Sequence, residues 1–150
     1  MPSQILLLSI RPKYAEKIFD RTKKVELRRV RPRLLNEGDL VLVYVSSPQK
    51  AVLGSFNVKK IIEKPIIQLW DEVENKAGIT SEEFYDYYEG VTVGVGIFFK
   101  NIQTFIQPVK LQVLRDNLSN FRPPQSFCYL TKTQFETVNF LAQCQKKIND

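Results

Sequence analysis

Residues 21–28 read RTKKVELR, and their side chains alternate between apolar and charged. This period of two predicts a β-strand over residues 23–30, with Val25 and Leu27 on one face. Residues two apart on a strand share a face, so Glu26 and Arg28 lie together, and Lys23 approaches them from the beginning of the strand. One short strand therefore presents a carboxylate between two cations.

This charged cluster has two interpretations. In the first, Lys23 and Arg28 bind a phosphate, while Glu26 accepts hydrogen bonds from a base edge or acts as a general base. In the second, the three charges form an ion-paired rim that only stabilises the strand. The residues alone leave both open.

The sequence on either side of this stretch predicts a mixture of short strands and helices. Residues 39–45 (DLVLVYV) are apolar on both faces, which indicates a central strand. Gly54 indicates a bulge or a close backbone approach, and Pro108 indicates a break. Thr80 and Glu83 form a capping box. The predicted strands cover 4–10, 23–30, 39–45, 51–62, 91–99, 102–111 and 126–130, the predicted helices cover 12–20, 66–73, 81–88 and 134–147, and 115–124 is a predicted loop.

These elements define a fold class. The strands carry glycines and breaks, and they do not alternate regularly with helices. We therefore expect an α+β protein, built as a small, partly open β-barrel with helices near the start, in the middle and at the C-terminus. A chain of 150 residues has the usual size of one domain, so we expect a single domain over residues 1–150.

Positive charge is concentrated in the first part of the chain. Residues 1–33 hold ten Lys or Arg and three acids, whereas the whole chain has a net charge of +6. This uneven balance favours an anion-binding surface over a solvated charged face. Residues 71–89 are the opposite, with seven acids and one lysine.

The composition excludes several kinds of chemistry. The chain has no histidine, and its two cysteines form no CxxC pair. Ser-His-Asp and Cys-His catalysis and imidazole zinc sites are therefore excluded, and we expect no metal and no cofactor. No apolar run approaches the roughly 18 residues that a membrane span needs. We expect a cytoplasmic protein with no membrane partner.

The charged stretch resembles the signature of the ASCH domain family, G-x-K-x-x-E-x-R. Lys23, Glu26 and Arg28 match the signature, and Arg21 stands where the glycine is usual. The surrounding sequence is also similar to this family. The similar segments are Ser9-Ile10-Arg11-Pro12-Lys13, the helix at 14–19, Gly38-Asp39 before an apolar strand, Gly54, and Ile62-x-x-Pro65.

The resemblance implies a PUA-like β-barrel with a cleft lined by the motif. The family is associated with RNA binding, RNA metabolism and coactivator-like roles, so the expected partner is RNA or a nucleotide-like ligand. Arg11 and Lys13 flank the same end of the barrel, and further arginines follow the strand. The predicted ligand-binding residues are Arg11, Lys13, Lys23, Glu26, Arg28, Arg29 and Arg31.

Two further functions stay open beside this binding module. Some members of the family are described as ribonucleases, and one branch resembles amidohydrolases that deacylate N4-acetylcytidine with a threonine at the position of Glu26. In an enzyme, Lys23 would serve as a base or phosphate clamp and Glu26 as the acid–base group. A regulatory protein-interaction domain is the third possibility, with its partner on the acidic segment 71–89.

Aromatic and hydroxyl side chains are secondary candidates for the cleft. Tyr44, Phe56 and Trp70 have rings that can stack on bases, although core packing explains each of them more simply. Ser46 and Ser47 either donate hydrogen bonds into the cleft or only form a turn.

Overall fold

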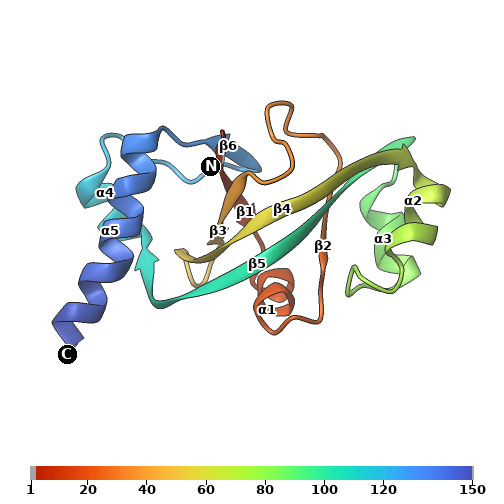
Figure 1. The fold of residues 1–150 in the computed structure, drawn as a ribbon. Helices are drawn as coiled ribbons and strands as arrows, with labels where there is room; N and C mark the ends of the chain where they lie inside the picture. The colour runs from red at the N-terminus through yellow and green to blue at the C-terminus, as the bar shows by residue number, and fades with distance from the viewer. Residues whose placement is uncertain (1–2, 150) are drawn as a thin grey trace.

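The computed structural model describes residues 3–149, in which six strands and five helices follow one another (Figure 1). Among these helices, none is at once long enough and apolar enough to pass through a bilayer. The elements are β1 (Ile5–Ile10), α1 (Pro12–Phe19), β2 (Val25–Arg28), β3 (Leu40–Val45), β4 (Ala51–Pro65), α2 (Ile66–Val73), α3 (Ser81–Tyr87), β5 (Val93–Lys110), α4 (Leu111–Asn117), β6 (Phe127–Tyr129) and α5 (Lys132–Asn149).

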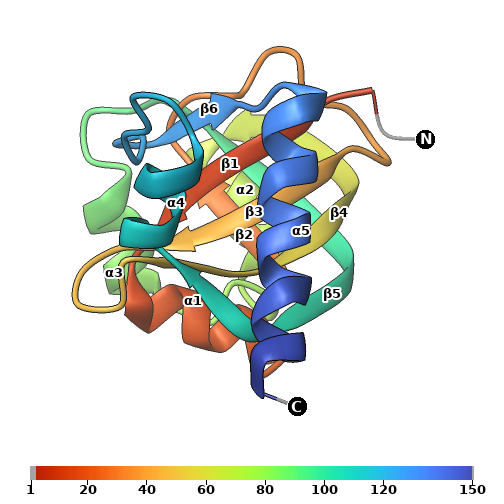
Figure 2. The same ribbon diagram turned by 90° about the vertical axis from the view of Figure 1, so that its left-hand side faces the viewer.

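The strands form one mixed sheet in the order β2-β5-β4-β3-β1-β6. β1 and β3 are parallel, and the other neighbours are antiparallel. β4 and β5 run the length of the molecule, with α2 and α3 at one end and α4 and α5 at the other (Figure 1). The sheet curls into a half-barrel, and α5 lies across its outer side (Figure 2). The expected α+β, partly open barrel with helices at the start, middle and C-terminus is confirmed.

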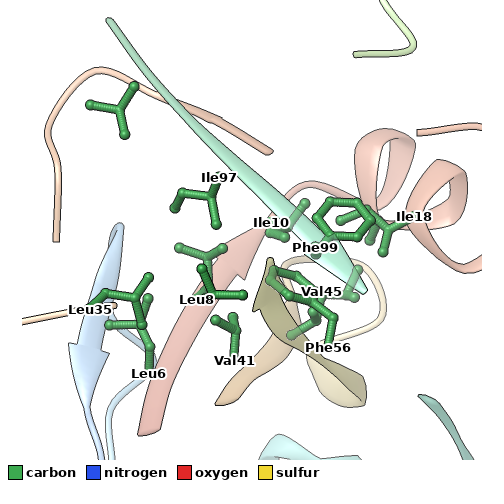
Figure 3. Close-up of a cluster of buried hydrophobic side chains, with 14 residues drawn as sticks. Leu6, Leu8, Ile10, Ile18, Leu35, Val41, Val45, Phe56, Ile97 and Phe99 are labelled. Atoms are coloured by element: carbon green, nitrogen blue, oxygen red, sulfur yellow. The ribbon is translucent and has the colours of Figure 1, made fainter. Parts of the chain in front are cut away.

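The central strands are buried on both faces, as their continuous apolar sequence predicts. Leu6, Leu8, Val41 and Val45 point into the barrel interior together with side chains of β4, β5 and α1 (Figure 3). Alternate residues such as Leu7 and Leu42 pack on the other face with α4 and α5. A third cluster packs α2 and α3 against β2 and β5. Three clusters around one sheet explain why helices cover both of its ends.

The prediction of separate strands at 91–99 and 102–111, the second broken at Pro108, is wrong, because β5 is one 18-residue strand. The pairing of β5 with β4 steps from Val109 opposite Val52 to Thr104 opposite Gly54, so extra β5 residues bulge out between these positions. Pro108 lies in this bulge, where its missing N–H costs no ladder hydrogen bond.

The predicted strand and loop around residues 111–117 are also wrong, since this segment forms α4. Leu111, Leu114 and Leu118 follow helical spacing, and Leu114 is fully buried. The residue before the helix is Lys110, which provides no capping side chain. The usual start signal was therefore missing, and the short helix is stabilised by burial of its leucines.

Gly54 has the close backbone approach that the sequence indicates. A side-chain Cβ at this position would lie 2.1 Å from the carbonyl oxygen of Gln103 and 2.7 Å from the Phe19 ring. We expect Gly54→Ala to lower the free energy of unfolding by about 3 kcal/mol, because strand backbones must move apart. Urea unfolding measures the change.

Gly96→Ala is the matched control. The atoms nearest to an added Cβ there are side-chain carbons of Ile62 and Val25 at 3.3 Å, which can yield. We expect a loss of about 1 kcal/mol or less. If both variants lose the same free energy of unfolding, the close contact with β5 does not require glycine at position 54.

Candidate functional site

Lys23, Glu26 and Arg28 form a buried ion triad. The Lys23 Nζ lies 3.1 Å from Glu26 Oε1, and an Arg28 terminal nitrogen lies 2.9 Å from Glu26 Oε2. Their side chains are 4%, 7% and 12% exposed, so the triad is largely shielded from water. The predicted shared face of Glu26 and Arg28 is confirmed, and Lys23 approaches as expected.

The turn after α1 delivers Lys23 to this position. Arg21 adopts the left-handed conformation, with φ of 70°, at the site where the family signature usually has glycine. This costs a residue with a Cβ about 1–2 kcal/mol. The turn is held by the Lys23 backbone N–H, which donates to the Lys17 carbonyl at 2.9 Å. The reversal directs the Lys23 side chain back toward β2.

Arg28 joins the two edges of the half-barrel. One of its nitrogens donates to the Ser9 carbonyl at 2.8 Å and another contacts the Ser126 hydroxyl at 3.4 Å. β2 is one edge strand of the sheet, and Ser126 immediately precedes β6, the other edge strand. The guanidinium thus bridges the open side of the barrel, which is a structural role that sequence reasoning did not foresee.

The charge of Glu26 is maintained by its two partners. Burial alone would raise the pKa of Glu26, but Lys23 and then Arg28 together lower it below its usual value. The carboxylate is therefore ionised at neutral pH, and the triad carries one net positive charge. A carboxylate with a lowered pKa is a weak general base, which bears on any catalytic role.

The triad forms part of the wall of a cleft of about 720 Å³. The other walls come from the ends of β1 and β3, from α1, α3 and α4, and from the segment before β6. Three exposed cations also line it, namely Arg11, Lys50 and Arg115. The remaining lining residues are Ser9, Ile10, Tyr14, Leu27, Tyr44, Ser46, Ser47, Ile79, Glu83, Tyr87, Leu111, Pro123, Pro124 and Gln125.

The structure brings together some of the predicted ligand-binding residues and separates others. Arg11 lines the cleft, whereas Lys13 lies outside the lining and pairs with the lining residue Glu83 of α3 at 2.9 Å. Arg29 donates instead to the Glu89 carbonyl, and Arg31 donates to the Leu35 carbonyl, both outside the lining. β2 ends at Arg28, so the alternation that groups the arginines in sequence does not continue.

Of the aromatic candidates, Tyr44 is a lining residue. It is nearly buried, and burial raises its pKa although Arg115 opposes the shift. Phe56 stacks on Phe99 in the core with ring centroids 4.5 Å apart, and Trp70 packs on Phe84. Core packing, the simpler interpretation, holds for these two rings. Ser46 and Ser47 both line the cleft.

Sequence reasoning missed several lining residues. The ring of Tyr14 lies 5.0 Å from the Lys23 ammonium, and the Tyr87 hydroxyl contacts the Leu27 carbonyl at 3.3 Å. Lys50 ends the β3–β4 turn with φ of 49°, and Arg115 comes from the unpredicted α4. No local pattern marks these residues, because only chain closure places them together. Within residues 3–143, whose side chains the structure describes, no group of three or more His, Cys, Asp and Glu is arranged to hold a metal ion.

A curled, partly open sheet with flanking helices and a charged cleft defines the PUA-like class of α+β proteins. The ASCH domain family model matches residues 8–105, and the chain belongs to this family. It is 29% identical over 128 residues to an ASCH domain-containing ribonuclease of Zymomonas mobilis, covering 85% of each chain.

Solved structures agree with this assignment. The crystal structure of an ASCH protein from Zymomonas mobilis matches with a TM-score of 0.86 at 28% identity, over 91% of this chain and 94% of that one. Human THYN1 in complex with DNA containing 5-methylcytosine matches with a TM-score of 0.61 at 16% identity, over 93% and 98% of the chains. The second match shows the fold alone.

The triad predicts a specific dependence of stability on pH. At pH 7, we expect Glu26→Gln to lower the free energy of unfolding by about 3 kcal/mol, because two cations remain buried without a carboxylate. The native pKa of Glu26 lies below the unfolded value of about 4.3, so the wild type loses this stabilisation as the pH falls from about 4.3 through the native pKa. Urea unfolding between pH 7 and pH 3 should show the two proteins converging.

Glu72→Gln is the control, since Glu72 pairs with Lys64 on the surface. It should change the free energy of unfolding at pH 7 by much less than Glu26→Gln does. A gap between wild type and Glu26→Gln that stays constant down to pH 3 would contradict the assigned charge of Glu26.

Proposed function

We propose that the cleft binds RNA or a nucleotide-like ligand, with phosphate on its exposed cations and a base toward the triad. The observation that carries this proposal is the combination of a buried, net-positive triad with three exposed cations in the lining of one cavity. The lining holds five Lys or Arg and two carboxylates. Such an excess attracts anions, and a cavity of this size suits a small ligand.

The buried and exposed cations have different parts in this proposal. Lys23 and Arg28 are already occupied by Glu26, and Arg28 also holds the Ser9 carbonyl. Arg11, Lys50 and Arg115 are exposed on the cleft wall. Long, exposed cations make phosphate contacts at little desolvation cost, so these three are the proposed phosphate ligands.

A base has suitable contacts near the triad. An ionised carboxylate offers about four acceptor positions, and the triad uses one on each Glu26 oxygen, which leaves acceptor capacity for an amino group. The Lys23 ammonium has further donors. Tyr14 and Tyr87 provide rings on the same wall, and aromatic rings stack on unpaired bases. These features favour single-stranded or free nucleotides over a closed duplex.

Relatives support a nucleic-acid ligand. The Zymomonas mobilis relative is named a ribonuclease, and THYN1 is solved with DNA. The basic first part of the chain agrees with this class of ligand. The protein-interaction alternative through residues 71–89 stays a prediction.

RNA cleavage is the second candidate function, favoured by the name of the Zymomonas mobilis relative. Glu26 is a poor acid–base group here, because both its oxygens are paired and its pKa is lowered. The deacylase alternative has less support. This chain has Glu26 where that branch has its threonine. The nearby Thr22 does not replace it, because its hydroxyl donates to Asp20 at 2.6 Å and lies outside the cleft lining.

Fluorescence anisotropy with labelled single-stranded RNA, over a salt series, tests the proposal. We expect Lys50→Ala/Arg115→Ala to weaken binding at least tenfold and to reduce the slope of log K against log salt by about 1.4, which is the loss of two phosphate contacts. Electrophoresis of the same RNA after incubation detects cleavage.

The control variant is Lys100→Ala/Lys132→Ala, which removes two exposed lysines outside the cleft. It matches the charge change and should leave the slope nearly unchanged. Equal losses in the two double variants, or no RNA binding by the wild type, would contradict binding in the cleft. Lys23 and Arg28 are unsuitable for this test because their removal also disturbs the fold.

A further inference from the structure

An ion pair joins α1 to α3 at the cleft. The Lys13 Nζ lies 2.9 Å from Glu83 Oε2, and the two residues are 70 positions apart in the chain. Glu83 lines the cleft, and the Lys13 ammonium lies 5.6 Å from the ring of Tyr14, which also lines it. Lys13 itself is not a lining residue, so the pair places a cation of α1 at the edge of the cleft, next to two lining residues and already bound to a carboxylate of the protein.

The two oxygens of Glu83 have separate tasks. Oε1 accepts hydrogen bonds from the Thr80 backbone N–H at 3.1 Å and from the Thr80 hydroxyl at 3.2 Å, which completes the capping box of α3. Oε2 faces Lys13. Lys13 can therefore leave without loss of the cap, and the carboxylate remains fixed. The Lys13 hydrogen bond, followed by the Thr80 backbone, lowers the pKa of Glu83 to about 2, so it is ionised at neutral pH.

Other contacts hold α3 in place when the pair opens. Phe84 and Tyr88 are buried, and the Tyr88 hydroxyl donates to the Arg28 carbonyl at 3.0 Å. The Lys17 ammonium holds the Gly78 carbonyl in the loop before α3 at 2.5 Å. The Lys13–Glu83 pair can thus open by movement of the Lys13 side chain alone, while α3 stays in place. This side chain is 61% exposed.

We propose that Lys13 is a phosphate ligand held in reserve by Glu83, so that this pair sets the preference of the cleft for phosphorylated over neutral ligands. The inference rests on the proposed nucleotide binding and names a specificity determinant of the same site. An exposed ion pair is weak, and a phosphate dianion is a stronger partner for an ammonium than a carboxylate is. A phosphate therefore displaces Glu83 from Lys13, while a nucleoside without phosphate leaves the pair closed.

Isothermal titration calorimetry with the four nucleoside 5′-monophosphates and their four nucleosides tests the proposal. Glu83→Gln removes the competing charge but retains a capping side chain at the same position of α3. We expect it to bind the monophosphates about three- to fivefold more tightly and the nucleosides unchanged. Lys13→Ala should weaken monophosphate binding by a similar factor, again with the nucleosides unchanged. Glu72→Gln, which breaks the Lys64–Glu72 pair outside the cleft lining, should change neither.

Two results would overturn the proposal. If the Glu83→Gln variant binds both monophosphates and nucleosides more weakly than the wild type, Glu83 itself contacts the ligand. Unchanged binding of both ligand classes would show that the Lys13–Glu83 pair has no effect on the choice of ligand. In either case, RNA binding that still depends on Lys50 and Arg115 would preserve the proposed function. If the wild type binds neither RNA nor mononucleotides, the proposed function is overturned together with this inference.

Discussion

The carboxylate of Glu26, placed between Lys23 and Arg28, is the interaction on which the structure most depends. Three buried charges are stable only when they are mutually paired, because removing any one leaves another uncompensated in a poorly solvated site. The same arrangement fixes the Arg28 guanidinium, which ties β2 to β1 and to the segment before β6. The half-barrel is held across its open side by the residues that form one wall of its cleft, so the cleft and the fold share their central contacts.

This sharing divides the cations of the cleft into two groups. Lys23 and Arg28 give the site a fixed positive potential and a defined wall, but they have little freedom to follow a ligand. Arg11, Lys50 and Arg115 are exposed and lie on three different segments of the chain. Lys13, at the edge of the cleft, is intermediate, since it is exposed but paired with Glu83. In the proposed binding mode, the prepaired triad adds little conformational cost, whereas each flexible cation must be ordered when a ligand binds.

Local patterns in the sequence are sufficient to predict much of the fold. The period of two placed Glu26 and Arg28 on one face, the capping box at Thr80 marked the start of α3, and α2 has the predicted bounds of 66–73. The errors have a common physical cause. Pro108 sits in a bulge that exists only because β4 and β5 pair over a long distance, and α4 is stabilised by burial rather than by a cap. Likewise, Lys50 and Arg115 meet in the cleft through the closure of the chain, which no local pattern encodes.

The most direct measurement of the central claim is a nuclear magnetic resonance titration of the labelled protein with a short single-stranded RNA. We expect backbone amide shifts to change at Tyr14, Ser46, Ser47, Lys50 and Arg115. The Arg28 guanidinium Nη–H signals should persist, because these nitrogens contact Glu26 and Ser9 in a triad that stays paired. Changes confined to α5 or to the outer face of α2, with the cleft residues unmoved, would contradict binding in the cleft. Loss of the Arg28 Nη–H signals on binding would show that the ligand replaces Glu26, which would also contradict the paired triad.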